Sequence, residues 1–376
     1  MYGSLYIHVP FCRAKCSYCD FYSIAIDGEK EALALRYVTA LRREAQVRAR
    51  GDLDTVFIGG GTPSVLPAGS IRAILECLGE HAHIIDGAEV SVEANPESLG
   101  QSFLDELLNA GVTRLSVGVQ SFDDGLLSVL SRPHTSRQAL DALERARHSG
   151  LDISIDLMYS IPGQTSDIWM QTLETALDLG LSHISAYELT VEPATALMAG
   201  VSSGELKMPP EGEALEMYEA ARDVLAGAGY EHYEVSNYAL PGKRSRHNMN
   251  YWRRGGYLGL GPGAVSFSEG KRRRNLPDVA DYCDSLEHGE LPAFEQESPT
   301  RQEASREFLM LGLRTAEGVD LHEATDRYGL ARLSEAAGEF IDPGMMAIVG
   351  GRLSMTEKGM PLMNTILVML FESLAV

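Results

Sequence analysis

The chain has 376 residues, with 32 Lys or Arg against 53 Asp or Glu, and its net charge is −21 at pH 7. This acidic balance excludes a globally basic face for nucleic acid or anionic membranes, although it leaves room for a local basic pocket. Hydrophobic residues make up 44% and charged residues 23%, which excludes general disorder. The length predicts two to three domains with a sizeable core.

The N-terminus carries neither the basic and apolar regions of a secretory signal nor an Arg-rich leader. No apolar run reaches the roughly 18 residues that a membrane-spanning helix needs. The most apolar stretch, residues 361–376, contains Asn364 and Glu372 and is expected to be a docked terminal helix. We therefore expect a cytoplasmic protein without a transmembrane segment, in which clustered cysteines stay reduced and indicate bound metal.

A cluster of cysteines directly follows the first predicted strand. Three of the five cysteines fall within eight residues, at Cys12, Cys16 and Cys19. Three thiolates on a short loop can hold three irons of a [4Fe–4S] cluster and leave the fourth iron open to a chelating ligand. Zinc is the alternative, but its ligands usually come as two spaced pairs, and position 21 carries Phe21 instead of a fourth thiol. Cys77 and Cys283 fall in or near helical stretches and are expected to be buried.

Short β-rich runs alternate with helical stretches over the first 230 residues. Strands are predicted at 5–9, 55–58, 89–93, 114–119, 152–158 and 183–189, and helices at 30–50, 70–80, 101–110, 136–149, 167–179 and 213–228. Helix-ending glycines follow at Gly51, Gly111, Gly150, Gly180 and Gly229. Strand–helix units in series predict an α/β fold with a parallel sheet. Polar residues at the strand ends favour a barrel, whole or partial, over a nucleotide-binding fold.

The strand ends carry residues suited to a ligand. The second strand ends in Gly59, Gly60 and Gly61, followed by Thr62, and consecutive glycines let backbone N–H groups approach an anion closely. Later strands carry Glu93, Gln120 and Asp156. Such polar side chains need partners, either within the barrel or on a ligand with ribose hydroxyls, an adenine and a charged amino acid.

The Cys-x3-Cys-x2-Cys triple, with Tyr18 before its last cysteine, resembles the radical S-adenosylmethionine (SAM) superfamily. The resemblance implies a partial (β/α)6 TIM-like barrel, a [4Fe–4S] cluster on the three cysteines, and SAM on the open iron. An electron from the cluster cleaves SAM in that family, forming a 5′-deoxyadenosyl radical.

The strand-end residues, together with Tyr6 and with Arg132 in Leu130–His134, resemble the oxygen-independent coproporphyrinogen III oxidase family over nearly the whole chain. This resemblance implies SAM contacts from Tyr6, Tyr18, Gly60, Gly61, Thr62, Glu93, Gln120, Arg132 and Asp156. The fork-shaped guanidinium of Arg132 suits the SAM carboxylate, with a surface ion pair as the alternative.

The pattern changes after about residue 230. We predict the barrel with its cluster and SAM site over 1–235, and a strand and loop region packing on it over 236–295. A small, mostly helical, winged-helix-like C-terminal domain is predicted over 296–376, with a wing or turn near 353–359. The glycines between 255 and 263 are expected to form an ordered turn, because they lack the strand–helix context of a dinucleotide loop.

A short sequence motif and the end of the cysteine motif distinguish two branches of the family. True oxidases carry a long N-terminal extension and a fourth cysteine, whereas this chain starts close to its first strand and its motif ends in Phe21. Residues 246–252 contain an HNxxYW string that resembles the signature of the heme chaperone branch, HemW. His247 can ligate heme iron, and Tyr251 and Trp252 offer flat aromatic faces to a macrocycle. The basic run 271–274 can pair with propionates. Packing of the histidine and aromatics, and a solvated basic run, are the alternatives.

These residues predict a heme chaperone without coproporphyrinogen III oxidase activity, and no catalytic residue is assigned. Its expected partners are heme and acceptor apo-hemoproteins, respiratory enzymes among them, with a flavodoxin or ferredoxin as reductant and no nucleic acid. One alternative is an oxygen-independent coproporphyrinogen III oxidase that decarboxylates two propionates through a 5′-deoxyadenosyl radical. A second is a radical SAM enzyme acting on another substrate, with the aromatic residues purely structural.

Overall fold

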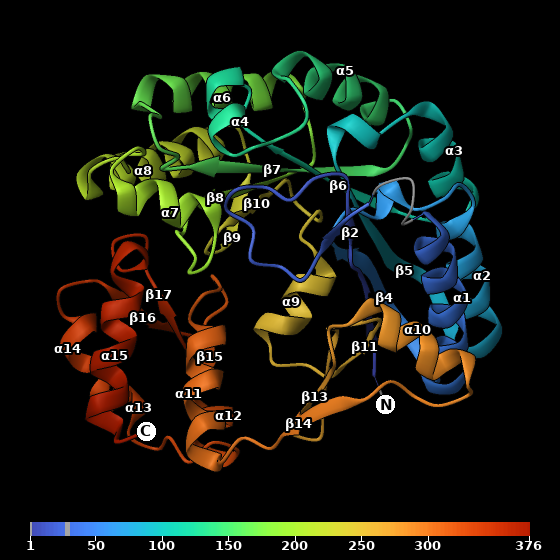
Figure 1. Cartoon of the computed structure of the whole chain (residues 1–376). Coiled ribbons are helices and arrows are strands. Elements are labelled where there is room, and N and C mark those ends of the chain that lie inside the picture. Colours follow the sequence, from blue (N-terminus) through green and yellow to red (C-terminus); the bar gives the residue numbers. More distant parts are fainter. Residues whose placement is uncertain (1, 27–30) are drawn as a thin grey trace.

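A twelve-stranded sheet forms the centre of the computed structural model, which describes residues 2–26 and 31–376 (Figure 1). Six neighbouring parallel strands form its middle: β1 (Ser4–Val9), β4 (Asp52–Gly60), β5 (His83–Ala94), β6 (Arg114–Gln120), β7 (Asp152–Tyr159) and β8 (His183–Glu188). All six strands predicted from the sequence are confirmed. Their parallel order brings their carboxyl ends to one edge of the sheet.

Helices cover the outer face of this curved sheet (Figure 1). They are α1 (Glu31–Arg48), α2 (Ser70–His81), α3 (Gln101–Asn109), α4 (Asp124–Val129), α5 (Ser136–Arg147), α6 (Ser166–Asp178), α7 (Ala196–Ser203) and α8 (Glu211–Gly227). The six predicted helices are confirmed, except that the predicted start of the first, Lys30, lies outside the described residues. The short helices α4 and α7 were not predicted. The five glycines expected after helices all have positive φ, as a left-handed helix end requires.

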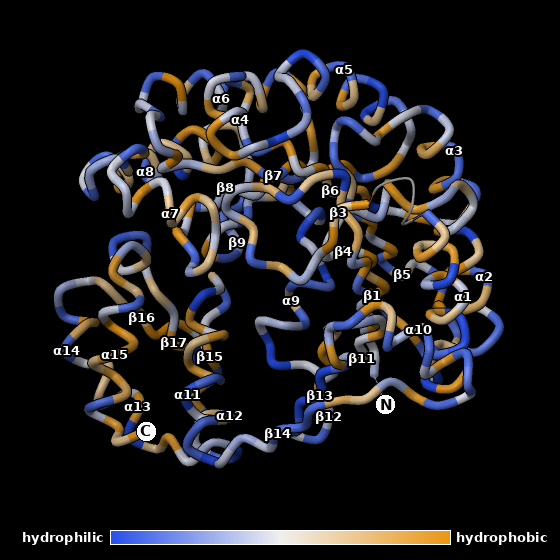
Figure 2. The backbone as a smooth tube through the Cα atoms, in the orientation of Figure 1, coloured by the Kyte–Doolittle hydropathy of each residue, from blue (hydrophilic) through white to orange (hydrophobic). Residues whose placement is uncertain are grey.

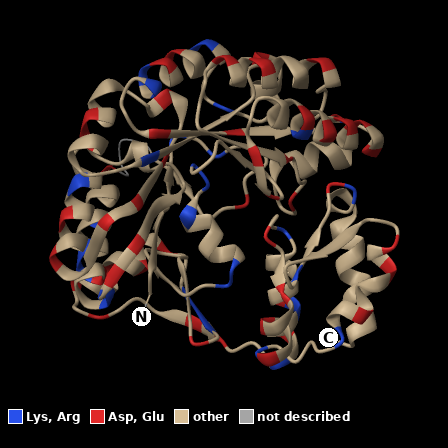
Figure 3. Ribbon diagram, turned by 180° about the vertical axis from the view of Figure 1, so that it is seen from behind, with Lys and Arg blue, Asp and Glu red and all other residues tan. Residues whose placement is uncertain are grey.

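Side chains along β1 point alternately into the hydrophobic core and into the barrel interior. Leu5, Ile7 and Val9 are fully buried, whereas Tyr6 and His8 point to the opposite face because strand side chains alternate. Figure 2 shows hydrophobic residues along the central strands and hydrophilic residues on the outer helices and turns. Figure 3 shows Asp and Glu spread over the outer helices. The net charge is therefore distributed rather than gathered on one face.

Residues 231–297 extend the sheet at both edges. Strand β10 (Asn237–Ala239) pairs antiparallel with β8, and β9 (Glu231–Glu234) pairs antiparallel with β10 at the edge. On the other side β11 (Tyr257–Leu260) pairs parallel with β1, followed by β12 (Val265–Ser268), β13 (Lys271–Asn275) and β14 (Phe294–Glu297). Helix α10 (Val279–Glu287) packs on α1. The sheet does not close on itself, because its two ends are β9 and β14.

The prediction of strands and loops over residues 246–252 is wrong, since they form helix α9 (Arg246–Trp252). Two caps explain the helix. The Ser245 hydroxyl accepts a hydrogen bond from the Asn248 N–H at 3.2 Å, and the Glu89 carboxylate accepts the N–H groups of Arg246 and His247, each at 2.9 Å. Glu89 lies on β5, so the sequence around α9 could not reveal this cap.

The C-terminal part is mostly helical, as predicted. It contains α11 (Arg301–Gly312), α12 (Leu321–Asp326), α13 (Leu333–Ala336), α14 (Gly338–Ile341) and α15 (Met363–Leu374), with a small sheet of β15 (Val319–Asp320), β17 (Arg352–Met355) and β16 (Met346–Val349). The wing or turn predicted near 353–359 overlaps only β17 of a hairpin formed by β16 and β17, and the hairpin turns earlier, at Gly350 and Gly351, both with positive φ. The terminal helix docks through Ile366, Leu367 and Leu370. Among the described helices, none is long and apolar enough to cross a membrane.

Candidate functional site

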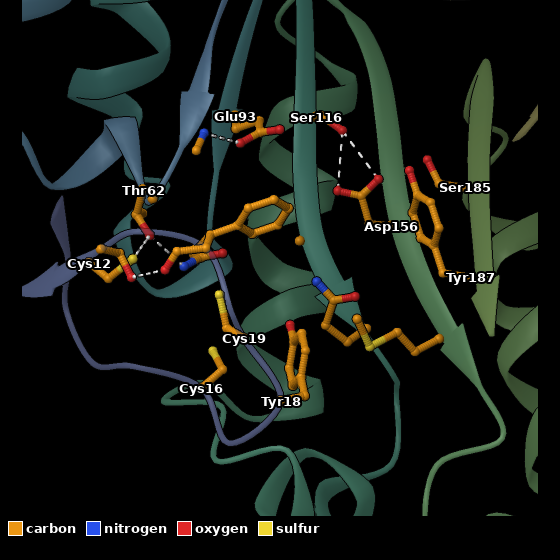
Figure 4. Close-up of a pocket in the computed structure, with 18 of the residues that line it drawn as sticks. Cys12, Cys16, Tyr18, Cys19, Thr62, Glu93, Ser116, Asp156, Ser185 and Tyr187 are labelled. Atoms are coloured by element: carbon orange, nitrogen blue, oxygen red, sulfur yellow. Dashed lines mark hydrogen bonds between the residues drawn. The ribbon is translucent and has the colours of Figure 1, made fainter. Parts of the chain in front are cut away.

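The cysteine loop lies at the carboxyl ends of the parallel strands, where it lines a cavity of about 440 Å³ (Figure 4). Strand β2 (Phe11–Cys12) holds its first cysteine and pairs with β3 (Ile24–Ala25). Cys12, Cys16 and Cys19 are all partly exposed and face this cavity, whereas Cys77 and Cys283 are buried in the core as expected.

Hydrogen-bond donors already reach two of the three sulfurs. The Thr62 hydroxyl donates to Cys12 Sγ at 3.5 Å, and Nη1 of Arg132 donates to Cys16 Sγ at 3.3 Å. Burial raises the pKa of the Cys12 and Cys19 thiols. Among the described residues, no three His, Cys, Asp or Glu side chains are grouped closely enough for a single metal ion. The fit to a larger cluster rests on the thiol spacing and on these donors.

The glycine turn after β4 allows the backbone to enter the site. A Cβ on Gly59 would lie 2.6 Å from a carboxylate oxygen of Glu93, and one on Gly61 would lie 2.5 Å from the carbonyl oxygen of Phe11. Gly60 has φ +104, which L-residues rarely adopt, and its N–H donates to Glu93 Oε2 at 2.9 Å. No other residue type fits these three positions without displacing its neighbours.

Two buried carboxyl groups face each other across the same cavity. Burial raises the pKa of Glu93 to about 7 and also raises that of Asp156. Asp156 accepts the Ser116 hydroxyl at 3.4 Å (Figure 4). A carboxyl with a raised pKa is ready to accept hydrogen bonds from an ammonium group or from ribose hydroxyls, because a bound cation restores its ionised form.

Two buried polar atoms in this cavity have no hydrogen-bond partner among the described residues. They are Oε1 of Gln120 and Nε of Arg132. Arg132 is otherwise held by Asn95, whose Oδ1 accepts from Nη2 at 2.7 Å. An orphaned acceptor and an orphaned guanidinium N–H fit a polar ligand that carries both a donor and a carboxylate. The cavity therefore suits SAM by its donor set.

Eight of the nine residues predicted for SAM line this cavity, and Tyr6 does not. Tyr6 lies on β1 beside Gly60, with its hydroxyl 2.9 Å from Nδ1 of His8. It lines a second cavity of about 420 Å³ on the side of β11. The structure thus places Tyr6 at the wall between two cavities.

The three residues predicted for heme are not gathered around one space. His247 is fully buried, with Nδ1 at 2.8 Å from the Thr55 hydroxyl and Nε2 at 2.8 Å from the Tyr251 hydroxyl. Tyr251 lines the second cavity. Trp252 packs beside Met249 instead. Neither nitrogen of His247 is free for iron in this arrangement, and the role of His247 as a ligand stays a prediction.

The arginines of the basic run 271–274 on β13 are likewise not gathered around one space. Arg272 binds Glu297 at 3.1 Å and also pairs with Glu307, and the Arg273 guanidinium lies 3.7 Å from the centre of the Phe294 ring. Arg274 lines the second cavity.

Sequence reasoning missed several cavity residues, namely Asn95, Ser116, Ser185 and Tyr187. Ser116 shares a face with Gly118 and Gln120 of β6, as Ser185 does with Tyr187 of β8, because side chains alternate along a strand. Two steps of two back from Gln120 reach Ser116, whereas the sequence singles out no residue of the strand at 183–189 from which Ser185 could be reached. Asn95 follows Glu93 by the same step of two.

Comparison with known proteins adds family matches to this geometry. Residues 6–176 match the radical SAM superfamily, and residues 300–362 match the HemN C-terminal domain. The chain is 35% identical to heme chaperone HemW of Lactococcus lactis, over 97% of this chain and 96% of that protein. It is 37% identical to heme chaperone HemW of Bacillus subtilis, over 87% of both chains. A third HemW, from Mycobacterium tuberculosis, is 35% identical over 94% of this chain and 91% of its own length.

Among solved structures, the fold is similar to coproporphyrinogen III oxidase HemN of Escherichia coli. The TM-score is 0.81, and the match covers 98% of this chain and 89% of that chain at 23% sequence identity. This likeness confirms the fold class, a partial radical SAM barrel followed by a small helical part.

Proposed function

The chain belongs to the heme chaperone HemW family of the radical SAM superfamily, and we propose that it binds heme and transfers it to acceptor hemoproteins. The observation that carries this proposal is the near full-length similarity to three heme chaperones, joined to a site that suits SAM and a cluster. Cytoplasmic action is part of the proposal, because the three clustered thiols must stay reduced.

Cys12, Cys16 and Cys19 would hold the [4Fe–4S] cluster, which supplies an open iron for SAM and a path for one electron. Thr62 and Arg132 would donate hydrogen bonds to the Cys12 and Cys16 sulfurs, as they do here. Such bonds to cluster sulfurs stabilise the reduced state, since they favour added negative charge. A flavodoxin or ferredoxin is the reductant that we propose.

SAM would lie in the cavity of about 440 Å³, with its charged ends matched to charged side chains. The amino group would face Glu93 and the glycine turn, and the carboxylate would accept from the orphaned Nε of Arg132. Asp156 and Gln120 would bind ribose and adenine atoms, with Tyr18 packing along the ligand. Tyr6 does not line this cavity, so it would support the SAM site from its position next to Gly60.

Of the residues expected to bind the cargo, His247 is fully buried and the half-buried Trp252 packs beside Met249. Tyr251 lines the second cavity, in the part between 236 and 295 that extends the sheet. We propose that the part over 1–235 holds the cluster and SAM, that 236–295 contributes to heme binding, and that 296–376 forms the small C-terminal unit.

The alternative is an oxygen-independent coproporphyrinogen III oxidase, which one observation favours, namely the shared fold with HemN. A shared fold does not by itself establish a shared activity. Phe21 takes the position of the oxidase branch's fourth cysteine and is 63% exposed at the rim of both cavities.

Two assays on the anaerobically reconstituted chain test the proposal. Titration with ferric heme is expected to give a stable Soret band at one heme per chain. Incubation with coproporphyrinogen III, SAM and dithionite is expected to give no protoporphyrinogen. Formation of protoporphyrinogen with turnover would establish the oxidase instead, and failure to bind heme would remove the chaperone function.

A further inference from the structure

A buried ion pair lies close to the SAM cavity without lining it. Nδ1 of His134 is 3.4 Å from Oε2 of Glu97, and the two side chains are 0% and 5% exposed. This distance is longer than an ordinary hydrogen bond, so charge holds the pair together. Glu97 lies on the short 3-10 helix η2 (Pro96–Ser98) after β5, and His134 follows Arg132 by two residues. Neither side chain lines the cavity, so neither is among the residues that would contact SAM.

Hydrogen bonding fixes the protonation of this pair. Nε2 of His134 is 3.2 Å from the carbonyl oxygen of Val119 and must donate to it, because a carbonyl only accepts. A neutral imidazole would then turn the lone pair of Nδ1 toward the Glu97 carboxylate, and two acceptors repel each other. One further proton must therefore lie between Nδ1 and Glu97. Burial alone would raise the pKa of Glu97, but His134 and Arg132 hold it below its usual value, so the proton is on His134, which is an imidazolium.

Glu97 has little other compensation for its charge. Within residues 2–26 and 31–376, neither of its carboxylate oxygens has a hydrogen-bond partner. An ionised carboxylate in the protein interior is costly unless a cation lies beside it. Arg132 is a second cation whose charge lowers the pKa of Glu97. If His134 were neutral, Glu97 would therefore attract the guanidinium of Arg132 instead.

The guanidinium of Arg132 is needed elsewhere. Nη1 donates to Cys16 Sγ at 3.3 Å, and Nη2 donates to Asn95 Oδ1 at 2.7 Å. The orphaned Nε is the proposed donor to the SAM carboxylate. A shift of this group toward Glu97 would break these contacts. The charge on His134 therefore keeps Arg132 available to the cysteine loop and to SAM.

The hydrogen bond from Nε2 of His134 also fixes a strained turn. It ends on the carbonyl of Val119, directly before Gln120, whose φ of +69 is one that residues other than glycine rarely adopt. Strand β6 shifts its register against β7 at the same point. Gln120 carries the other orphaned polar atom of the SAM cavity, Oε1. One buried histidine thus holds in place both residues whose orphaned atoms would meet SAM.

We propose that His134 is a positioning residue of the SAM site: its imidazolium neutralises Glu97, so that Arg132 stays on Cys16 and on the SAM carboxylate, and its Nε2–H holds the turn before Gln120. The inference rests on the proposed function, since it concerns the SAM site of that function. It adds to this site two buried residues that touch neither SAM nor the cluster cysteines. It also makes the charge of the pair, rather than its packing, the property on which SAM binding depends.

SAM binding to the anaerobically reconstituted chain tests the role of this charge. Equilibrium dialysis gives the affinity, and EPR of the dithionite-reduced cluster gives a second readout, because a ligand on the open iron changes the signal. His134→Gln keeps an N–H for Val119 but loses the charge. It is expected to weaken SAM binding about tenfold or more, as the loss of a charge-assisted hydrogen bond requires, and to need correspondingly more SAM for the EPR change. His148→Gln is the matched control and should bind SAM as the wild type does, since His148 is exposed at the end of α5 and pairs with Glu144 at 3.1 Å.

A second substitution distinguishes the effect of charge from packing defects and from misfolding. Glu97→Gln removes the carboxylate that would attract Arg132, so it is expected to weaken SAM binding much less than His134→Gln does. The double variant, His134→Gln with Glu97→Gln, is expected to recover most of the affinity and the EPR change. Packing defects alone would give the double variant no gain over His134→Gln. An unfolded chain cannot regain binding through a further substitution.

Two results would overturn the inference. One is a His134→Gln variant that keeps the wild-type affinity for SAM and the wild-type EPR change. The other is a double variant that binds SAM no better than His134→Gln. If the wild-type chain itself binds no SAM, the SAM site of the proposed function fails instead. Titration of the wild-type chain with ferric heme tests the chaperone function separately.

Discussion

At the scale of single residues, the clustered cysteines differ from the isolated ones in their surroundings. Cys16 faces a cavity beside Arg132, whereas Cys283 is fully buried in the core. We predict that Cys16→Ser, reconstituted anaerobically with iron and sulfide, loses most of the broad visible absorbance of a [4Fe–4S] cluster and much of its iron. Cys283→Ala is the matched control and should bind the wild-type amount of iron. A full cluster in Cys16→Ser would show that Cys16 is not a ligand.

Glu93 gives SAM binding a pH dependence. Its pKa is raised to about 7, above the usual 4.5, because the carboxyl is buried. Its ionised form, which suits an ammonium group, therefore increases from pH 6 to pH 8, and SAM affinity should rise about tenfold over that range. Glu93→Gln keeps an acceptor for the Gly60 N–H but cannot ionise. Equilibrium dialysis of SAM should give this variant a flat and weaker profile, and an equally steep profile would contradict the assignment.

That the three clustered cysteines and eight of the nine residues expected at SAM gather around one cavity could be predicted from the sequence, because they lie on short motifs at strand ends. The position of His247 could not, since its partners Thr55 and Tyr251 include a residue 192 positions away. In a sequence, a histidine near two aromatic residues looks the same whether its side chain ligates iron or packs in the protein core. Only the direction of its two hydrogen bonds separates these roles.

At the scale of elements, α9 depends on a cap from another part of the chain. Glu89 of β5 accepts two N–H groups of its first turn. We predict that Glu89→Ala lowers the free energy of unfolding by about 1 to 2 kcal/mol, the usual effect of a lost helix cap. The same change should weaken heme binding several-fold, because His247 and Tyr251 are both on α9.

Thermal unfolding and heme titration measure these two effects. Asp86→Ala is the control, since Asp86 is an exposed carboxylate on the same strand. Unchanged stability and heme affinity in Glu89→Ala would show that the cap does not hold α9 in place.

Long elements with clear periodicity were predictable, whereas α9 was not. The six central strands and their helices follow from alternating and helical patterns closed by glycines. Helix α9 has only seven residues, and Asn, Tyr and Trp have modest helix propensity. Its stability comes from the tertiary cap, which no local pattern records.

At the scale of the whole molecule, the barrel joins the C-terminal part at a buried carboxyl group. Glu234 of β9 forms an isolated bridge with Thr315, and the N–H of Val235 donates to the carbonyl of Arg314 at 2.9 Å. Burial raises the pKa of Glu234 to about 7. The folded state therefore prefers the protonated carboxyl more than the unfolded state does.

This preference predicts a loss of stability with rising pH. The contribution of Glu234 is complete below its unfolded pKa of 4.5, falls as pH rises, and is lost above about 7. By pH 8 the loss should reach up to about 3 kcal/mol. Denaturant unfolding of the SAM-free chain at pH 5 and pH 8 should show a smaller difference for Glu234→Gln, which the flip of the Asn237 amide accommodates because its Oδ1 has no partner. An equal pH dependence in the variant would contradict the buried-acid account.

The barrel class was predictable at this scale, but the completion of the sheet was not. Strand β11 pairs parallel with β1 although their sequences are more than 240 residues apart. That pairing places Tyr257 beside β1, and Tyr257 and Arg274 line the second cavity together with Tyr6. Long-range strand order of this kind depends on the three-dimensional packing rather than on any local signal.

The central claim is that the chain transfers heme rather than transforming a porphyrinogen, and the rate of transfer tests it most directly. The heme-loaded chain is mixed by stopped flow with rising concentrations of a heme-free respiratory cytochrome, and separately with a heme-free globin as passive scavenger. The account predicts a rate that rises with cytochrome concentration beyond the rate set by the globin, since direct transfer requires an encounter. A rate that is independent of the cytochrome concentration and equal to the globin rate would mean that heme merely dissociates, and would contradict the chaperone function.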